Sequence, residues 1–293
     1  MPSIIPGYEY DIFISYRQKD NHSDQWVPEF VDNLKRNIVR YFIYLSLIIM
    51  TDGCSSSNEE PMIAPENPPF SGTIFIDPDI IKPSDPTTLD DLISAGVGQR
   101  LMFDRRQNTF VTYEAFLFNA FFDDSLTAEV QVNPEFGTQD EAMAAAVKYT
   151  EAIGRLPTAL REKMETVWIH KGIQPFRGGN NNILIHTGQG ELYINDGILE
   201  ETFVHEAAHT SLDPDHATAA GWIAAQEADP TFISTYAQQF SQREDIAESF
   251  LPYLAVRFRS DRISEELKQI ILLTMPNRIA YFDSLMLDMH PID

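Results

Sequence analysis

The residues best suited to chemistry lie in one short segment, 205–209, which reads His-Glu-Ala-Ala-His. Residues four apart lie on one face of a helix, so His205 and His209 can present their imidazoles to one Zn²⁺ ion. Glu206 projects beside them, where its carboxylate can take a proton from a water molecule at the metal. The spacing predicts a zinc-dependent hydrolase in which Glu206 is the general base.

The sequence around this motif supports the same interpretation. The pattern of residues 199–212 predicts a helix, which the motif geometry requires. A β-hairpin is expected just before it, with strands at 182–187 and 191–194 around Gly188-Gln189-Gly190. Such a hairpin would supply the edge strand that lines the substrate cleft of zinc peptidases. We therefore expect the motif helix and a neighbouring strand to form the site.

A third protein ligand is needed to hold a catalytic zinc ion. Residues 244–250 read Glu-Asp-Ile-Ala-Glu-Ser-Phe in a predicted helix, which places Glu244 and Glu248 on one face. This run resembles the gluzincin peptidases and is most similar to the catalytic domain of anthrax lethal factor. The resemblance implies that Glu244 is the third ligand and that Glu248 orients a ligand histidine. It also implies that Tyr236 stabilises the oxyanion, although Tyr236 lies eight residues before Glu244 rather than seven.

Two other residues compete for the place of third ligand. In metzincins a glycine turns the chain after the motif helix and a third histidine returns to the metal. Here Leu212 stands where that glycine would be, His216 comes one residue late, and Asp215 occupies the expected position. The sequence thus leaves Glu244, His216 and Asp215 as candidates and favours Glu244.

The first part of the chain reads as unrelated pieces. Residues 10–16 read Tyr-Asp-Ile-Phe-Ile-Ser-Tyr, and the stretch 7–37 resembles the opening strand and helix of a TIR domain. The resemblance covers about thirty residues, and a TIR domain needs several further βα units. We therefore expect residues 1–34 to be a TIR-like fragment and not a folded domain.

A basic start and about ten apolar residues make the stretch 35–53 similar to a secretory signal peptide. The Gly-Cys pair that follows resembles a lipobox, which implies lipidation of Cys54 in a bacterial lipoprotein. Because a signal peptide normally begins a protein, we expect the natural start to lie near Lys35. The Pro- and Ser-rich stretch 54–89 reads as a tether, and 90–293 as the catalytic domain.

Composition narrows the class of protein further. The net charge of −23 argues against nucleic-acid binding, because a phosphate backbone repels such a surface. Strands first and helices later predict an α+β, zincin-like domain with a mixed or antiparallel sheet. We expect a monomeric zinc metallopeptidase that acts on peptides or proteins, at the cell envelope as an outer-surface lipoprotein or secreted. It would meet a membrane only through its lipid anchor. The alternative is a surface-exposed binding lipoprotein with this fold and little or no turnover.

Overall fold

The chain divides into two compact units, residues 1–61 and 62–293. The structure, a computed structural model, describes residues 63–74, 76 and 78–292, which all belong to the second unit. The TIR-like fragment, the signal-like stretch and Cys54 lie outside the described residues.

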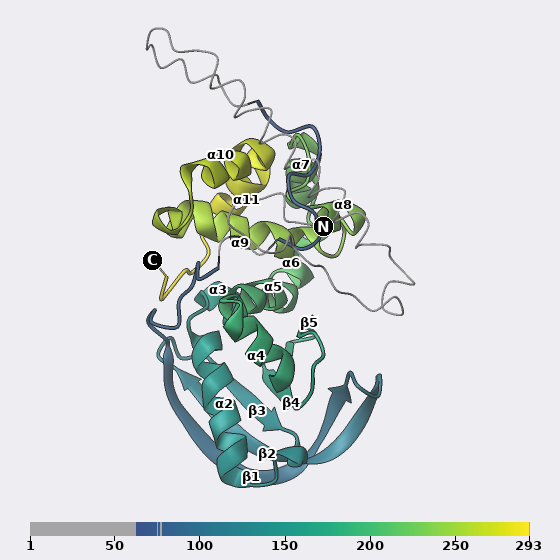
Figure 1. Cartoon of the computed structure of the whole chain (residues 1–293), viewed down its shortest axis with the longest axis vertical. Helices are drawn as coiled ribbons and strands as arrows, with labels where there is room; N and C mark the ends of the chain where they lie inside the picture. Colours follow the sequence, from purple (N-terminus) through teal and green to yellow (C-terminus); the bar gives the residue numbers. More distant parts are fainter. Residues whose placement is uncertain (1–62, 75, 77, 293) are drawn as a thin grey trace, which may run out of the picture. The chain divides into compact units, whose positions relative to one another are not determined.

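Six strands form one mixed sheet in the described part of the chain (Figure 1). Their order is β1-β2-β3-β4-β6-β5. The β1, β2 and β3 strands are antiparallel, β3, β4 and β6 are parallel, and β5 runs antiparallel beside β6. The strands are β1 Leu89–Asp104, β2 Thr109–Phe122, β3 Thr127–Val132, β4 Thr166–His170, β5 Arg177–Gly179 and β6 Asn182–His186.

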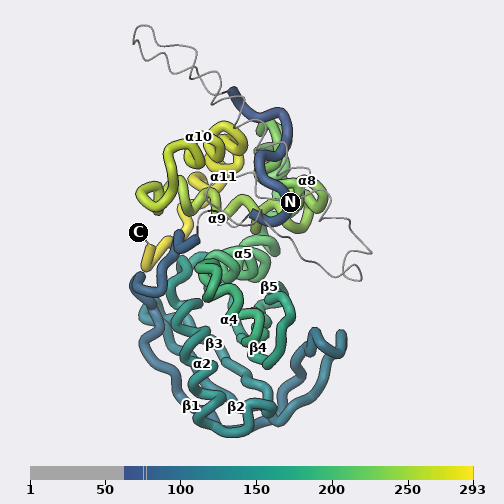
Figure 2. The backbone as a smooth tube through the Cα atoms, in the orientation of Figure 1, coloured from purple at the N-terminus to yellow at the C-terminus, as the bar shows by residue number. Residues whose placement is uncertain are grey.

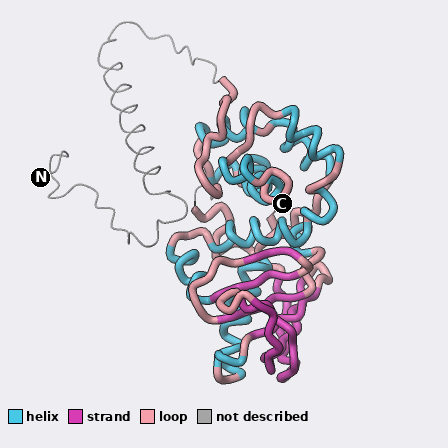
Figure 3. The backbone as a smooth tube through the Cα atoms, turned by 90° about the vertical axis from the view of Figure 1, so that its right-hand side faces the viewer, coloured by secondary structure: helices cyan, strands magenta, loops and turns pink. Residues whose placement is uncertain are grey.

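Ten α-helices and two short 3₁₀ helices accompany the sheet within residues 63–292, and most of them follow it in the chain. Strands gather at one end of this unit and the later helices at the other (Figure 3). The predicted α+β class is therefore confirmed. The helices are η1 Pro134–Phe136, α2 Gln139–Gly154, α3 Thr158–Arg161, α4 Thr187–Asn195, α5 Leu199–Ser211, α6 Asp213–His216, α7 Ala220–Ala228, α8 Thr235–Gln239, α9 Asp245–Phe258, η2 Ser260–Arg262, α10 Glu265–Thr274 and α11 Pro276–Leu285.

Helix α2 shows how sequence pattern and packing agree. The Thr138 side chain caps its first turn by accepting a hydrogen bond from the Glu141 backbone N–H at 3.2 Å. Ala142, Ala146 and Ile153 recur at helical spacing and are fully buried against the sheet. None of the helices in the described part is long and apolar enough to cross a membrane.

Helix α5 carries the His-Glu-Ala-Ala-His motif through the middle of this unit (Figure 1). Phe203, Val204 and Ala207 are fully buried in the core cluster, which fixes the rotation of the helix about its axis. Helix α9 packs along it, and the short edge strand β5 lies on its other side. The fold therefore gives the motif helix two neighbours from distant parts of the sequence.

The predicted strand at 191–194 is wrong, because these residues belong to helix α4. The hairpin that precedes the motif helix is formed instead by β5 and β6. The glycine at 190 serves close packing and not a turn, since a Cβ atom there would lie 2.3 Å from the Tyr149 hydroxyl oxygen. A glycine demanded by tertiary contact is indistinguishable, in a single sequence, from one demanded by a turn.

Several described residues between 70 and 88 pack against the domain, although the composition of this stretch had predicted a tether. Ile74, Ile76, Ile80 and Ile81 are all buried in the core. Phe70 forms an isolated parallel bridge with Ser234. We call the described part of residues 70–81 the strap. Figure 2 shows this part of the chain at the beginning of the coloured tube, beside the later helices.

Candidate metal centre

Three side chains converge between helices α5 and α9. The Nε2 atoms of His205 and His209 are 3.2 Å apart, and the Glu244 carboxylate oxygen Oε2 lies 3.1 Å from His209 Nε2 and 3.5 Å from His205 Nε2. The two histidines share a face of α5 because they are four residues apart. Glu244 immediately precedes α9 and is its N-cap residue. The structure thus brings together the three residues that the sequence favours as ligands.

The spacing of these atoms fits one metal ion. A tetrahedral zinc ion with N and O ligands at about 2.0–2.2 Å separates its ligand atoms by roughly 3.3–3.5 Å. The three observed separations fall close to that range, and among the described residues this is the cluster whose ligand atoms could share an ion. Two imidazoles and one carboxylate are also a donor set that catalytic zinc sites use.

Each ligand histidine has a carboxylate behind it. The Nδ1 atom of His205 lies 3.3 Å from Glu248 Oε1, as the resemblance implied, and the Nδ1 atom of His209 lies 2.7 Å from Asp213 Oδ2. Such contacts fix the orientation and tautomer of a ligand imidazole. The sequence analysis missed Asp213, although its position four residues after His209 was a usable signal.

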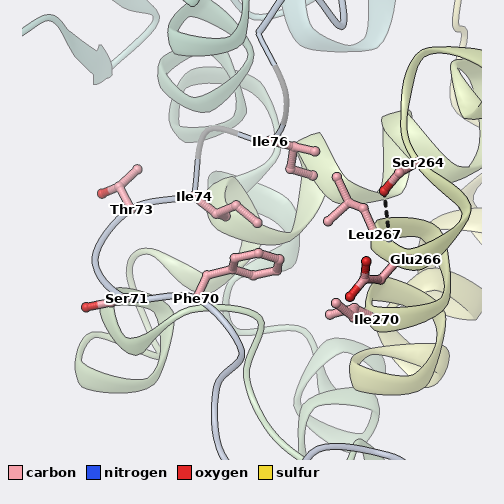
Figure 4. Close-up of a pocket in the computed structure, with 9 residues that line it drawn as sticks. All are labelled: Phe70, Ser71, Thr73, Ile74, Ile76, Ser264, Glu266, Leu267 and Ile270. Carbon is pink, nitrogen blue, oxygen red and sulfur yellow. Dashed lines mark hydrogen bonds between the residues drawn. The ribbon is translucent and has the colours of Figure 1, made fainter. Parts of the chain in front are cut away.

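The strap is hydrogen-bonded to Glu248, whose carboxylate lies behind His205. Glu248 Oε2 accepts hydrogen bonds from the Ser234 hydroxyl at 2.7 Å and from the Ile74 backbone N–H at 3.0 Å. The same part of the strap lines a cavity of about 340 Å³ with helix α10, in which Phe70, Ile74 and Leu267 face one another (Figure 4). Residues interpreted as a tether therefore complete the surroundings of the candidate metal centre.

The centre is strongly negative. Burial alone would lower the pKa of His205, but the nearby Glu244 and Glu248 carboxylates raise that pKa to about 10. Burial acts in the same direction on His209, and contacts with Asp213 and Glu244 raise its pKa to about 9. Burial would raise the pKa of Glu244, whereas the two histidines hold it well below its usual range. Such a site favours a bound cation.

Glu206 directly follows His205 on α5 and reaches toward the edge strand β5. Its Oε2 atom accepts a hydrogen bond from the Gly178 backbone N–H at 2.6 Å. The strand can come this close because residue 178 has no side chain: a Cβ atom there would lie 1.7 Å from the Glu206 carbonyl oxygen. One turn further on, Thr210 Oγ1 accepts from the Gly179 N–H at 2.9 Å. The edge strand is thereby fixed against the motif helix.

Tyr236 lies on the short helix α8, near Glu244. Burial raises the pKa of its hydroxyl, and the neighbouring Glu244 carboxylate raises it further. Its ring packs edge-on against Phe240 with centroids 5.1 Å apart. The phenol therefore stays protonated and able to donate near the cluster.

The two rival ligands lie elsewhere. The His216 Nδ1 atom is 2.8 Å from the Tyr281 hydroxyl, and its ring packs on that tyrosine at the α11 side. The Asp215 carboxylate is exposed and forms an ion pair with Lys163. Neither side chain belongs to the cluster of possible ligands. The proposed lipidation residue, Cys54, lies outside the described residues.

A buried ion network anchors the start of α9. Arg278 is fully buried, and its Nε atom donates to Asp245 Oδ2 at 2.9 Å while its Nη1 atom donates to Asp229 Oδ2, also at 2.9 Å. Asp245 follows Glu244 directly in the chain. The guanidinium thus fixes the backbone next to the third candidate ligand.

A second pair of histidines lies in the sheet. His170 and His186 end the neighbouring parallel strands β4 and β6, are fully buried, and stack with ring centroids 5.5 Å apart. Asn133 Nδ2 lies 2.9 Å from His170 Nδ1, and the other three ring nitrogens have no hydrogen-bond partner within the described part of the chain. Burial lowers the pKa of each imidazole to about 4. Both rings are neutral at pH 7.

No family model, no curated protein and no solved structure matches the chain. The case for a function therefore rests on the geometry of the site.

Proposed function

We propose that this chain is a zinc-dependent hydrolase with a zincin-like fold, and that it cleaves peptide bonds. The observation that carries the proposal is the convergence of His205, His209 and Glu244 within 3.5 Å, with Glu206 on the same helix as the two histidines. His205, His209 and Glu244 would hold the zinc ion. A zinc ion there would act as a Lewis acid and lower the pKa of a water molecule toward neutrality.

The proton chemistry falls to Glu206. Its carboxylate takes one proton from the attacking water while the water oxygen bonds to the peptide carbonyl carbon. It then delivers that proton to the leaving amine nitrogen as the C–N bond breaks, which returns Glu206 to its ionised form. The Gly178 N–H holds one of its oxygens, so the orientation of the carboxylate is set before substrate arrives.

Glu248 and Asp213 orient the candidate ligand histidines, and Tyr236 stabilises the charge that develops on the substrate. Glu248 and Asp213 hold the ligand imidazoles through their Nδ1 atoms. The Tyr236 hydroxyl donates a hydrogen bond to the carbonyl oxygen as negative charge develops on it.

Metal content and turnover test this proposal separately. We expect about one zinc ion per chain by elemental analysis, and its loss when both His205 and His209 are changed to Ala. Glu206→Gln should keep the zinc but lower peptide cleavage by about 10²–10⁴-fold, the usual contribution of a general base. A double variant that still holds stoichiometric zinc would refute the metal centre. Full zinc without any cleavage of a broad peptide mixture would point instead to a binding protein.

We also propose that the protein acts at the cell envelope, on peptide or protein substrates, and is anchored through lipidated Cys54. The support is the basic, apolar and Gly-Cys order of residues 35–54. Several acyl chains on one cysteine would anchor the protein stably. Expression in a lipoprotein-processing bacterium tests this. Cys54→Ala should leave the membrane fraction, and equal partitioning of variant and wild type would contradict the anchor.

A further inference from the structure

A second cavity, of about 350 Å³, lies against the edge strand that holds Glu206. The tip of the β1–β2 hairpin forms one wall, and strands β4, β5 and β6 form the other. It is lined by Phe103, Phe110, Trp168, Arg177, Leu184, residues 178–180 and Asn182. Figure 1 shows the long hairpin curling up at the side of the sheet.

Aromatic rings give this cavity its character. Phe110 packs edge-on against Trp168 with centroids 6.2 Å apart and against Phe103 at 5.2 Å. Yet Phe110 remains 58% exposed, which leaves a large apolar surface facing water. Covering apolar surface is favourable by roughly 25 cal/mol per Å², so this wall suits an apolar guest.

The cavity and the candidate base share strand β5. Gly178 lines the cavity, and its N–H is bonded to Glu206 Oε2 at 2.6 Å. The missing Cβ of Gly178 points at α5, so its neighbours Arg177 and Gly179 face the other side of the strand, where the cavity lies. Strand β5 therefore lies between the cavity and the base and touches both.

We propose that this cavity is the specificity pocket of the proposed peptidase and receives a large apolar, preferably aromatic, side chain next to the bond that is cleaved. The proposal rests on the proposed function. Successive side chains of an extended peptide point in opposite directions and are about 3.3 Å apart along the chain. A peptide bond placed at Glu206 thus leaves a neighbouring side chain within reach of the aromatic wall.

Arg177 marks the mouth of the cavity and offers a different chemistry. Its guanidinium lies 5.8 Å from the centre of the Phe103 ring and its side chain is exposed. An acidic side chain could pair with it. The three rings outnumber this single charge, which is why the aromatic guest is favoured.

Matched peptides test the pocket in the zinc-loaded full chain. Fluorogenic peptides that differ only in one residue beside the cleaved bond, Phe, Ala or Glu, should give kcat/KM at least about tenfold higher for Phe than for Ala. Phe110→Ala and Trp168→Ala should reduce that preference to within about threefold without changing the zinc content. Phe121→Ala is the control, because Phe121 is an exposed phenylalanine on β2 that does not line the cavity.

The outcomes separate this proposal from the proposed function. Cleavage without a Phe preference, or a preference that both cavity variants retain, overturns the pocket and leaves the peptidase intact. A preference for Glu that disappears in Arg177→Gln also overturns it. If nothing is cleaved, the peptidase fails, and calorimetry with the Phe and Ala peptides decides the pocket. Tighter binding of the Phe peptide that is lost in Phe110→Ala supports it, and equal binding overturns it.

Discussion

The unit that the structure describes contains two pairs of histidines with opposite surroundings. His205 and His209 lie one helical turn apart, and each Nδ1 atom faces a carboxylate. His170 and His186 lie on neighbouring strands, are fully buried, and have no carboxylate on either ring. The first pair has pKa values raised to about 10 and about 9, and the second has both lowered to about 4.

This difference shows that burial alone does not decide whether a pair of histidines is charged. Burial disfavours the charged imidazole at both places, and only the carboxylates reverse its effect. The carboxylates around the α5 pair stabilise positive charge at that place, whereas the surroundings of the sheet pair keep both of its imidazoles neutral. Changing these surroundings one at a time tests how far the comparison holds.

Removing a ligand should have the largest effect. Glu244→Ala leaves two imidazoles with no third donor, so we expect stoichiometric zinc binding and peptide cleavage to be lost together. Equilibrium dialysis followed by elemental analysis measures the first. The matched control is Glu162→Ala, on a carboxylate outside the cluster. Retained zinc in Glu244→Ala together with lost zinc in His216→Ala would replace the gluzincin-like ligand set with a metzincin-like one.

Forcing the edge strand away from the motif helix should be nearly as damaging. In Gly178→Ala the added methyl group meets the Glu206 carbonyl oxygen, so β5 must move and its N–H must leave the Glu206 carboxylate. We expect kcat to fall by at least about 100-fold and the free energy of unfolding by about 1–3 kcal/mol. Kinetics and urea unfolding measure the two effects. Unchanged kcat would mean that Glu206 does not depend on the strand.

Weakening a supporting carboxylate should have a smaller effect than losing a ligand. Asp213→Asn keeps the size of the side chain but removes the charge behind His209, and we expect zinc affinity to fall by about 10–100-fold. Competition with a chromogenic chelator measures the affinity. Asp215→Asn, two residues away and exposed, is the control. An affinity equal to wild type in Asp213→Asn would assign this carboxylate to the fold alone.

The sheet pair should be visible in the pH dependence of stability. The pKa of each ring is about 4 in the folded chain, against about 6.5 when unfolded, so the unfolded chain binds more protons between these values. The stability contribution is present above pH 6.5 and lost as pH falls toward 4. Asp104 and Arg106, which face the pair, remain charged over most of this range.

Urea unfolding at pH 7 and pH 5 measures this contribution. His186→Met should reduce the difference in the free energy of unfolding between pH 7 and pH 5 by on the order of 1 kcal/mol. The same slope in variant and wild type would show that other groups dominate acid unfolding.

The smallest effect is expected at His216, which belongs to neither pair. His216 contacts Tyr281 and not the cluster, so His216→Ala should change zinc affinity by no more than a few-fold. The chelator competition described above measures this as well. A larger loss would show that the α6 turn rearranges when metal binds.

The parts of the candidate site that the sequence could predict are those whose residues are spaced one helical turn apart. His205 and His209 are four residues apart within α5, and Glu244 and Glu248 are four residues apart at the start of α9, so helical spacing was enough to pair them. The meeting of Glu248 with the strap could not be predicted, since Ile74 is 174 residues away and contributes only its backbone. The role of Gly178 was equally hidden, because the need for a missing side chain arises from a helix 28 residues later.

The composition of the strap was misleading for a related reason. Its proline, Pro78, and its polar residues are typical of a chain that cannot fold alone, and the strap has no helix or strand of its own within its described residues. Four isoleucines, spaced irregularly between them, nevertheless fill gaps in a core built by other elements. A periodicity search does not detect such residues.

The strap also determines where the chain could be cut without disturbing the surroundings of the candidate site. A protease cut before residue 70 would leave every described contact with Glu248 and Glu201 in place. A cut between residues 74 and 81 would free the Ile74 N–H from Glu248 or the Ile81 N–H from Glu201. A form that has lost the strap would keep all three candidate ligands. It would lack the Ile74 hydrogen bond to Glu248, so His205 would be oriented less firmly. In the proposed peptidase, a cut in this segment would therefore lower activity although the candidate ligands and Glu206 stay in the chain.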